Sequence, residues 1–221
     1  MQFFLDSANL AEIKEALAWG VIAGVTTNPT LLSREEAPFE PLAREICALM
    51  QGSPVSLEVL ATTADEMVEE ALKLAVLAPN VVVKIPMGAE GLKAVSSLKR
   101  QGNRVPCNVT LIFSVSQALL AARAGAAYIS PFIGRLDDIG WDGAALVEEI
   151  VAVFRRQALD TPVIAASIRH SVHVQRVAAA GAHIATVPFS VLQQMAAHPL
   201  TSQGIDRFLT DWTRRKGEGR H

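Results

Sequence analysis

The residue best suited to chemistry is Lys84, which lies within the apolar run VVVKIP at positions 81–86. A short β-branched run predicts a buried strand, and a buried ammonium is costly unless it is paired or neutralised. A desolvated lysine amine attacks carbonyl carbons, so Schiff-base chemistry is the first hypothesis. The alternative is a lysine whose stem follows the strand end while its amine reaches solvent.

Polar side chains also lie at the ends of other apolar runs. Each one alone fits an ordinary hydrogen-bonded strand end, but many buried polar groups together are costly unless they share a function. We therefore expect them to form one active site. The set consists of Asp6, Thr26, Thr27, Asn28, Glu58, Lys84, Asn108, Thr110, Ser130, Arg135, Ser167 and Arg169.

Two carboxylates complete the chemistry that Lys84 would begin. We expect Asp6 and Glu58 on neighbouring strands, where carboxylates could move protons at the hydroxyls of a ketose and at a water. With Lys84 as the nucleophile, these three residues predict Schiff-base chemistry on a ketose.

Two arginines point to a phosphate. Arg135 and Arg169, with Ser167, follow the sixth and seventh runs, and arginine forks suit phosphate oxygens. The alternative for these arginines is a surface ion pair, with Arg135 pairing Asp137 or Asp138.

Eight apolar runs must position these residues. They lie roughly 20 to 35 residues apart, and the intervals have helical patterns, which is typical of a parallel sheet. Eight such units predict an α/β fold, a single (β/α)8 barrel with chemistry at the strands' C-terminal ends; an open doubly wound sheet is the alternative. The runs are Phe3–Asp6, Val21–Thr26, Val55–Leu60, Val81–Ile85, Val105–Leu111, Ala127–Ser130, Val163–Ala166 and Ile184–Val187.

Alternation along the fifth run assigns its two faces. Side chains two residues apart share a strand face, so Asn108 and Thr110 face one way while Val109 and Leu111 face the other. We expect the polar face at the barrel mouth and the apolar face against the helices.

Helix signals fill the intervals between the runs. Asn9 is placed as an N-cap, and a capping-box pattern begins at Thr63. Gly102, Gly125 and Gly181 fall where helices should end. These signals fit repeated strand–helix units.

A last helical segment, Thr201–Lys216, follows the eighth unit. It either packs on a neighbouring subunit or closes the barrel base. Its apolar residues at helical spacing are Ile205, Phe208, Leu209 and Trp212. We assign residues 1–215 to one barrel domain with this extra helix, and residues 216–221 to a disordered tail or an expression remnant.

Composition narrows the classes of partner and compartment. The chain has 221 residues, a net charge of −2 and 50% hydrophobic residues, which allows a large core and provides no basic field for nucleic acid. No apolar run approaches the ~20 residues of a membrane span, and the start MQFFLDSANL lacks the basic region of a signal peptide. Cys47 and Cys107 are far apart, so we expect reduced thiols in a cytoplasmic protein.

The reaction calls for no cofactor and no metal, because a lysine imine itself supplies the electron sink. No GxGxxG follows the first run, and no GxxxxGK[ST] is present. His170 and His173 have a spacing that a metal could use, but no nearby cysteine or glutamate completes a site. We expect them to be solvated or capping histidines.

The chain resembles the transaldolases, specifically the short transaldolase/fructose-6-phosphate aldolase group, over residues 1–213. The resemblance rests on FFLDSAN, GVTTNPTLL, EVLATTADEMVEEALKLA, VVVKIPMGAEGL, CNVTLIFSVSQALLAARAGAAYISPFIGRLDD and AASIR. TTNP and KIP in this order and at this distance are highly specific. The resemblance implies a (β/α)8 barrel and class I aldol chemistry on sugar phosphates.

The resemblance also implies residue roles. Lys84 matches the Schiff-base lysine, Asp6 the proton-transferring aspartate, and Glu58 with Thr110 the pair that handles the catalytic water. The residues matched to dihydroxyacetone binding are Asn28, Asn108 and Ser130. The residues matched to phosphate binding are Arg135, Ser167 and Arg169.

Two positions separate the branches of the group. The aldolase branch typically has glutamine in place of Glu58 and tyrosine in place of Phe132, so this chain is similar to the transaldolases at both. A fructose-6-phosphate aldolase and a non-catalytic sugar-phosphate-binding barrel remain the alternatives. Members of the group commonly form decamers of two stacked pentamers, which implies a homo-oligomer.

Overall fold

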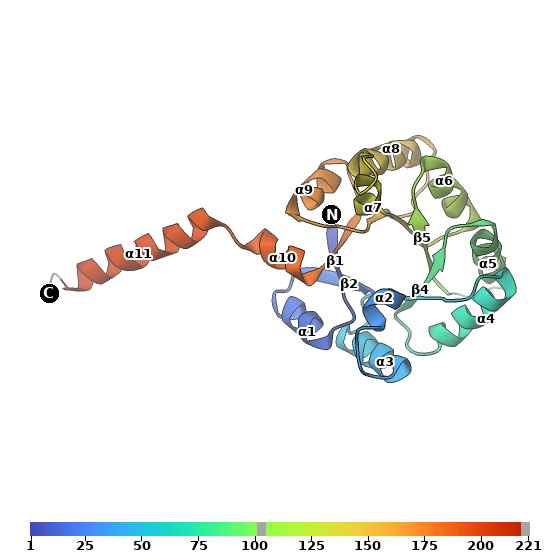
Figure 1. Cartoon of the computed structure of the whole chain (residues 1–221), viewed down its shortest axis with the longest axis horizontal. Coiled ribbons are helices and arrows are strands. Elements are labelled where there is room, and N and C mark those ends of the chain that lie inside the picture. Colours follow the sequence, from blue (N-terminus) through green and yellow to red (C-terminus); the bar gives the residue numbers. More distant parts are fainter. Residues whose placement is uncertain (101–104, 218–221) are drawn as a thin grey trace.

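The computed structural model describes residues 1–100 and 105–217, with side chains described as far as Arg215. Eight parallel strands form its centre (Figure 1), each within two residues of a predicted run. The strands are β1 (Gln2–Asp6), β2 (Ile22–Thr26), β3 (Val55–Glu58), β4 (Val81–Pro86), β5 (Cys107–Ile112), β6 (Tyr128–Pro131), β7 (Ile164–Ala165) and β8 (Ile184–Val187).

The sheet is a nearly closed barrel. Hydrogen-bonded neighbours run in the order β6-β5-β4-β3-β2-β1-β8-β7, so β6 and β7 form the last seam. Two isolated parallel bridges cross this seam, Ile129↔Val163 and Phe132↔Ala166. The predicted (β/α)8 barrel is therefore confirmed, and the open doubly wound sheet is wrong.

Helices surround the strands (Figure 1). Two short helices, α2 and α7, follow β2 and β6 and contribute residues to the barrel mouth. The helices are α1 (Leu10–Ala18), α2 (Pro29–Leu32), α3 (Phe39–Leu49), α4 (Ala64–Ala75), α5 (Ala89–Arg100), α6 (Val115–Ala124), α7 (Ile133–Asp137), α8 (Gly143–Arg156), α9 (Ser171–Ala179), α10 (Phe189–Ala196) and α11 (Pro199–Gly217).

The predicted helix ends are confirmed in part. The Asn9 side chain caps α1, and Gly125 ends α6 in the left-handed conformation with φ 105°, which a residue without Cβ adopts freely. The capping box at Thr63 is wrong, because the Thr63 hydroxyl donates to the Glu66 carboxylate and makes no cap bond. Gly102 lies outside the described residues.

The core lies between the barrel and its helices. Leu57, Val83 and Val109, which alternate with polar residues along their strands, are fully buried with Ile46 and Leu98 of the helix layer. Burying one such side chain is worth about 1.5–3 kcal/mol. The apolar strand faces therefore secure the helices, and the opposite faces are free to build a site.

Helix α11 lies apart from this core. It extends away from the barrel as an arm (Figure 1), so it does not close the barrel base, and that alternative is wrong. Its apolar side chains are exposed; they are Ile205, Phe208, Leu209 and Trp212. The helix reaches Gly217, and the rest of the predicted tail lies outside the described residues.

The cysteines and the helix lengths can also be compared with the predictions. Cys47 and Cys107 are both free, as predicted; both are also buried, and burial raises the pKa of their thiols to about 11 and about 12. Among the helices that the structure describes, none has the length and apolar character needed to cross a membrane.

Candidate active site

A cavity of about 380 Å³ opens at the C-terminal ends of the strands. Almost every residue predicted for the site lines it; the two that do not are Thr27 and Asn108, which are fully buried. Those that line it are Asp6, Thr26, Asn28, Glu58, Lys84, Thr110, Ser130, Phe132, Arg135, Ser167 and Arg169. Asp6 and Glu58 both line the cavity, but the prediction that they lie on neighbouring strands is wrong, because β2 lies between β1 and β3.

Lys84 is only 4% exposed, and its amine points into the barrel. Glu58 and Lys84 are partners in the β3–β4 ladder, and the Lys84 Nζ lies 3.0 Å from Glu58 Oε2. The same Nζ donates a hydrogen bond of 2.8 Å to the Thr27 carbonyl oxygen. The alternative of a lysine that reaches solvent is therefore wrong.

Asp6 receives a hydroxyl relay that the sequence did not predict. The Thr26 hydroxyl donates to Asp6 Oδ1 at 2.8 Å, and Thr186 lies 2.6 Å from the same hydroxyl. Because Thr26 uses its proton on Asp6, Thr186 acts as the donor to Thr26. Burial raises the pKa of Asp6, against the opposing effects of the Lys84 charge and the Thr26 bond.

The β5 side of the cavity carries an amide and hydroxyl group. Ser130 Oγ donates to Asn108 Oδ1 at 2.7 Å, and Asn108 Nδ2 lies 3.5 Å from Ser56 Oγ. The Thr110 hydroxyl is buried and has no hydrogen-bond partner within the described part of the chain. A buried hydroxyl in this state is costly unless a ligand or water meets it.

The predicted alternation fails at the end of β5. Leu111 was expected to face the helices but lines the cavity. Its φ of 59° is left-handed, and the pairing of β5 with β6 shifts between Val109 and Ile112. This local irregularity turns the side chain of Leu111 toward the mouth.

Asn28 has a structural task as well as a place at the mouth. Its Oδ1 accepts a hydrogen bond of 2.9 Å from the Leu31 amide and so caps the short helix α2. This cap fixes the residues after β2 against the cavity. The Asn28 Nδ2 group is the part of the amide available to a ligand.

Two arginines face the opposite side of the cavity. Arg135 lies on α7 with its guanidinium 5.0 Å from the centre of the Phe132 ring. Arg169 follows β7 and forms an ion pair of 2.9 Å with Asp138. The alternative of a surface ion pair is therefore confirmed for Arg169. For Arg135 it is wrong among the described residues, because Asp138 pairs with Arg169 and Asp137 with His173.

The backbone beneath these arginines is unusual. Ser167 has a φ of 60°, which is strained for a residue with a side chain. The Gly134 amide donates to the Ser167 carbonyl oxygen at 3.1 Å, and a Cβ at Gly134 would clash with this same backbone oxygen and would lie 2.8 Å from Arg169 Nε. Glycine at this position therefore lets the backbone after β7 pack directly on α7.

A family model described as Transaldolase/Fructose-6-phosphate aldolase matches residues 3–218. The chain belongs to this family. A probable transaldolase from Pelotomaculum thermopropionicum is 57% identical over 216 residues, covering 98% of this chain and 99% of the relative. A probable transaldolase from Kosmotoga olearia is 57% identical over 220 residues, covering 99% and 100%.

A solved structure supports the fold alone. Thiamine phosphate pyrophosphorylase from Pyrococcus furiosus superimposes with a TM-score of 0.56 at 14% identity, covering 85% of each chain. Unrelated chemistries share barrels of this kind, so this likeness carries no function.

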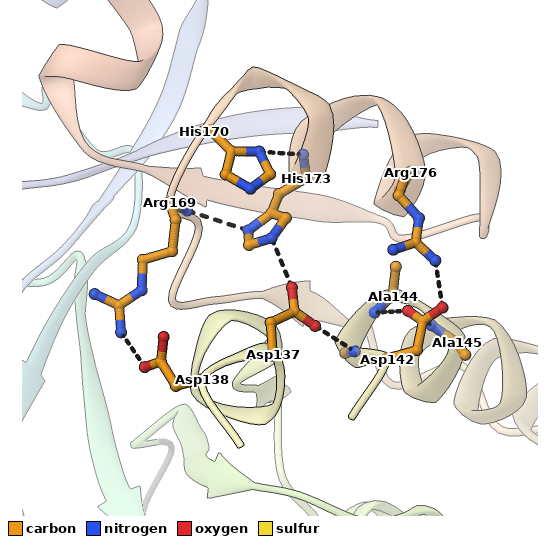
Figure 2. A network of polar contacts seen from close by, with 10 residues as sticks. Asp137, Asp138, Asp142, Ala144, Ala145, Arg169, His170, His173 and Arg176 are labelled. Atoms are coloured by element: carbon orange, nitrogen blue, oxygen red, sulfur yellow. Dashed lines mark hydrogen bonds and ion pairs between the residues drawn. The ribbon is translucent and has the colours of Figure 1, made fainter. Parts of the chain in front are cut away.

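His170 and His173 of this transaldolase-family chain have different surroundings (Figure 2). His170 caps α9, as predicted, by accepting a hydrogen bond from the His173 amide. His173 was expected to be solvated or capping but is buried beside Asp137. Across the described chain, no group of three or more histidine, cysteine or acidic side chains is placed to hold a metal.

Several participants were missed because their sequence signals are weak. Thr186 belongs to an ordinary apolar strand. Thr27 was in the predicted set, but its contact to Lys84 was missed because it uses the backbone carbonyl oxygen. Arg34, just after α2, also lines the cavity. A threonine in a strand or an arginine in a loop has no local pattern that marks it as part of a site.

Proposed function

We propose that this protein is a transaldolase that transfers a dihydroxyacetone unit between sugar phosphates through a Schiff base on Lys84. The reaction converts sedoheptulose 7-phosphate and glyceraldehyde 3-phosphate into erythrose 4-phosphate and fructose 6-phosphate, a step of the non-oxidative pentose phosphate pathway. The observation that carries the proposal is the buried Lys84 amine, 3.0 Å from the Glu58 carboxylate in a cavity that Asp6 also lines.

Glu58 supports imine formation. At 3.0 Å it is within direct proton-transfer distance of the Lys84 Nζ, so it accepts a proton from the ammonium. The neutral amine then attacks the ketose carbonyl carbon, and Glu58 returns its proton to the carbonyl oxygen, which becomes a hydroxyl. A second proton passes from the attacking nitrogen through Glu58 to this hydroxyl, which leaves as water and gives the protonated imine. The buried Thr110 hydroxyl is placed to hold this water.

Asp6 supports carbon–carbon bond cleavage. Its carboxylate takes the proton of the C4 hydroxyl, C4 becomes a carbonyl, and the electron pair of the C3–C4 bond flows into the imine to form an enamine. A pKa raised by burial makes Asp6 a stronger base than an ordinary carboxylate. The released aldose phosphate departs, and attack of the enamine on a second aldose phosphate reverses these steps.

Two groups of side chains would bind the ends of the donor. Asn28 and Ser130 line the cavity on the Lys84 side and would bind the dihydroxyacetone portion. Asn108 would join them through Ser130, whose hydroxyl donates to Asn108 Oδ1. Arg135 and Arg169, with Ser167, offer guanidinium and hydroxyl groups on the other side for the phosphate.

Phe132 and Glu58 support transfer over simple cleavage. For Glu58 the support is the branch difference, because the aldolase branch typically has glutamine there. The Phe132 ring packs 6.0 Å from the Phe113 ring and under Arg135, so it gives the cavity an apolar wall without a hydroxyl. A phenol at this position would offer a group to orient water and protonate the enamine. Without it, the enamine persists until an acceptor aldehyde arrives.

Borohydride trapping tests the proposal. Fructose 6-phosphate and borohydride should leave a covalent adduct on the peptide that contains Lys84, measured by mass spectrometry. An adduct elsewhere, or none, would overturn the assignment. Turnover of fructose 6-phosphate without erythrose 4-phosphate, at rates equal to those with it, would favour the aldolase instead.

The exposed arm supports a proposal about assembly. We place the protein in the cytoplasm as a homo-oligomer, a pentamer or a decamer, in which α11 packs on a neighbouring subunit. Its exposed side chains Ile205, Phe208, Leu209 and Trp212 would be buried by such contact. Sedimentation velocity should show an assembly that is lost when residues 199–221 are removed.

A further inference from the structure

The proposed phosphate side is assembled from two separate segments. Arg135 lies on α7, and Arg169 lies in the segment between β7 and α9. A phosphate held by both arginines requires that these segments keep a constant spacing, because charge-assisted hydrogen bonds depend strongly on distance and direction. The question is which side chains join the segments.

His173 makes that connection (Figure 2). Its Nε2 lies 2.7 Å from Asp137 Oδ2 at the end of α7, and its Nδ1 accepts a hydrogen bond of 3.2 Å from the Arg169 backbone amide. The other oxygen of Asp137 accepts a bond of 2.8 Å from the Gly143 amide at the start of α8. The His173 imidazole therefore links the Arg169 backbone to Asp137 of α7, and Asp137 in turn is bonded to the start of α8.

This arrangement requires one form of the imidazole. A backbone N–H can only donate, so Nδ1 must keep its lone pair and the proton must lie on Nε2, which donates to Asp137. A second proton on Nδ1 would place two donors against each other and break the bond to Arg169. The bond to Asp137 would survive protonation.

We propose that His173 is a positioning residue that holds the Arg169 backbone against α7 as a neutral imidazole, and that protonation of Nδ1 releases this backbone and weakens binding of the substrate phosphate. This inference rests on the proposed function only in taking Arg135 and Arg169 as the phosphate side. His173 is bonded to the Arg169 backbone and to Asp137 rather than to Lys84 or Asp6, so its effect should fall on affinity rather than on bond cleavage.

The charges around His173 set the direction of its response to pH. Burial lowers the pKa of His173, the neighbouring His170 and Arg176 lower it further, and Asp137 opposes them. Asp142 and Glu148 lie near Arg176 around a second hollow, while α10 and β8 carry no charged residue. A lowered pKa means that the neutral form, and the stability it adds, is fully present above about pH 6.5 and is lost as the pH falls through the lower folded value.

Two substitutions separate the two bonds of His173. In His173→Asn, Oδ1 replaces the Nδ1 acceptor and keeps the Arg169 bond, whereas His173→Gln reaches Asp137 and loses the Arg169 bond. We expect the glutamine variant to raise the KM for fructose 6-phosphate about threefold to tenfold at pH 8 with kcat nearly unchanged, and the asparagine variant to raise it less. An equal rise in both variants, or a loss of kcat alone, would overturn the proposal.

The matched control is His183→Gln. The His183 Nδ1 also accepts a backbone hydrogen bond of 3.2 Å, from Val163, but His183 precedes β8 and so lies at the opposite end of the barrel from the cavity. This control should leave KM unchanged. An equal KM rise in the control would assign the effect to general loosening and overturn the proposal.

Sulfate binding tests the inference without turnover, because sulfate mimics phosphate and does not titrate in this range. Calorimetry should show constant sulfate binding from about pH 8 to about pH 6.5 and progressively weaker binding below that in the wild type, with a flat response in His173→Asn. Asp137→Asn removes a charge that raises the His173 pKa, so the weakening should move to lower pH; a move to higher pH would contradict the mechanism. Sulfate results as predicted without transferase activity would retain the inference and reject the function, while activity with unchanged sulfate binding would do the reverse.

Discussion

The two sides of the cavity are built in different ways. On the lysine side, Glu58, Lys84 and Asn108 lie in register on neighbouring strands and are held by short buried contacts. On the arginine side, Arg135 and Arg169 are exposed residues of a short helix and a loop. The side proposed to make bonds is fixed by strand ladders, whereas the side proposed to bind phosphate depends on side-chain links.

The largest expected effect is on the lysine side. Lys84→Met should lower kcat/KM about 10⁴-fold or more and abolish borohydride trapping, because the covalent step is removed. Sulfate affinity should remain within about twofold if the arginine side is independent. Activity close to that of the wild type would revive the non-catalytic barrel.

Asp6→Asn should have the next largest effect. It should lower kcat about 10²- to 10⁴-fold while the imine still forms, so the borohydride adduct persists without turnover. In the wild type, activity should fall on the acid side at a pH above the usual carboxylate range, because burial raises the pKa of Asp6 and protonation removes the base. A variant that loses the adduct as well would assign Asp6 to imine formation.

Substitution on the arginine side should separate affinity from chemistry. Arg135→Ala should raise the KM for fructose 6-phosphate about tenfold to a hundredfold with kcat nearly constant, because one charge-assisted fork is lost. Unphosphorylated fructose should be turned over as by the wild type. A similar loss with both donors would place Arg135 outside the phosphate site.

The smallest kinetic effect should come from Asp138. Its carboxylate forms an ion pair of 2.9 Å with the Arg169 guanidinium and so competes with a phosphate for it. Asp138→Asn should free the arginine and lower the KM for fructose 6-phosphate by up to about threefold. Asp142→Asn is the control, since Asp142 pairs with Arg176 in the same exposed manner away from the cavity. A rise in KM would mean that Asp138 positions Arg169 rather than competing for it.

The same contrast explains what the sequence could predict. Strand alternation and the order of the runs were enough to bring Asp6, Glu58 and Lys84 to the same mouth, whereas the direct pairing of Glu58 with Lys84 came from the register of β3 and β4. These relations follow from the period of a strand and the rule that barrel chemistry lies at strand ends.

Other relations could not be read from local patterns. The His173–Asp137 link joins residues 36 positions apart through one side-chain rotamer, and Leu111 turned to the cavity through a left-handed backbone that no residue type announces. The helix of residues 199–217 was predictable from its period, but its direction away from the barrel was not, because apolar spacing does not identify what covers it.

The seam between β6 and β7 lies directly beneath the proposed phosphate side of the cavity. The barrel closes there through isolated bridges, and Arg135 and Arg169 stand on opposite edges of it. An anion bound by both arginines would hold the two edges of the seam together. Anion binding would therefore stabilise the closed barrel, and closure of the barrel would strengthen anion binding. Hydrogen exchange at the Ile129 and Ala166 amides, which bond across the seam, should slow when sulfate is added, and unchanged exchange would show that the wall and the mouth are uncoupled.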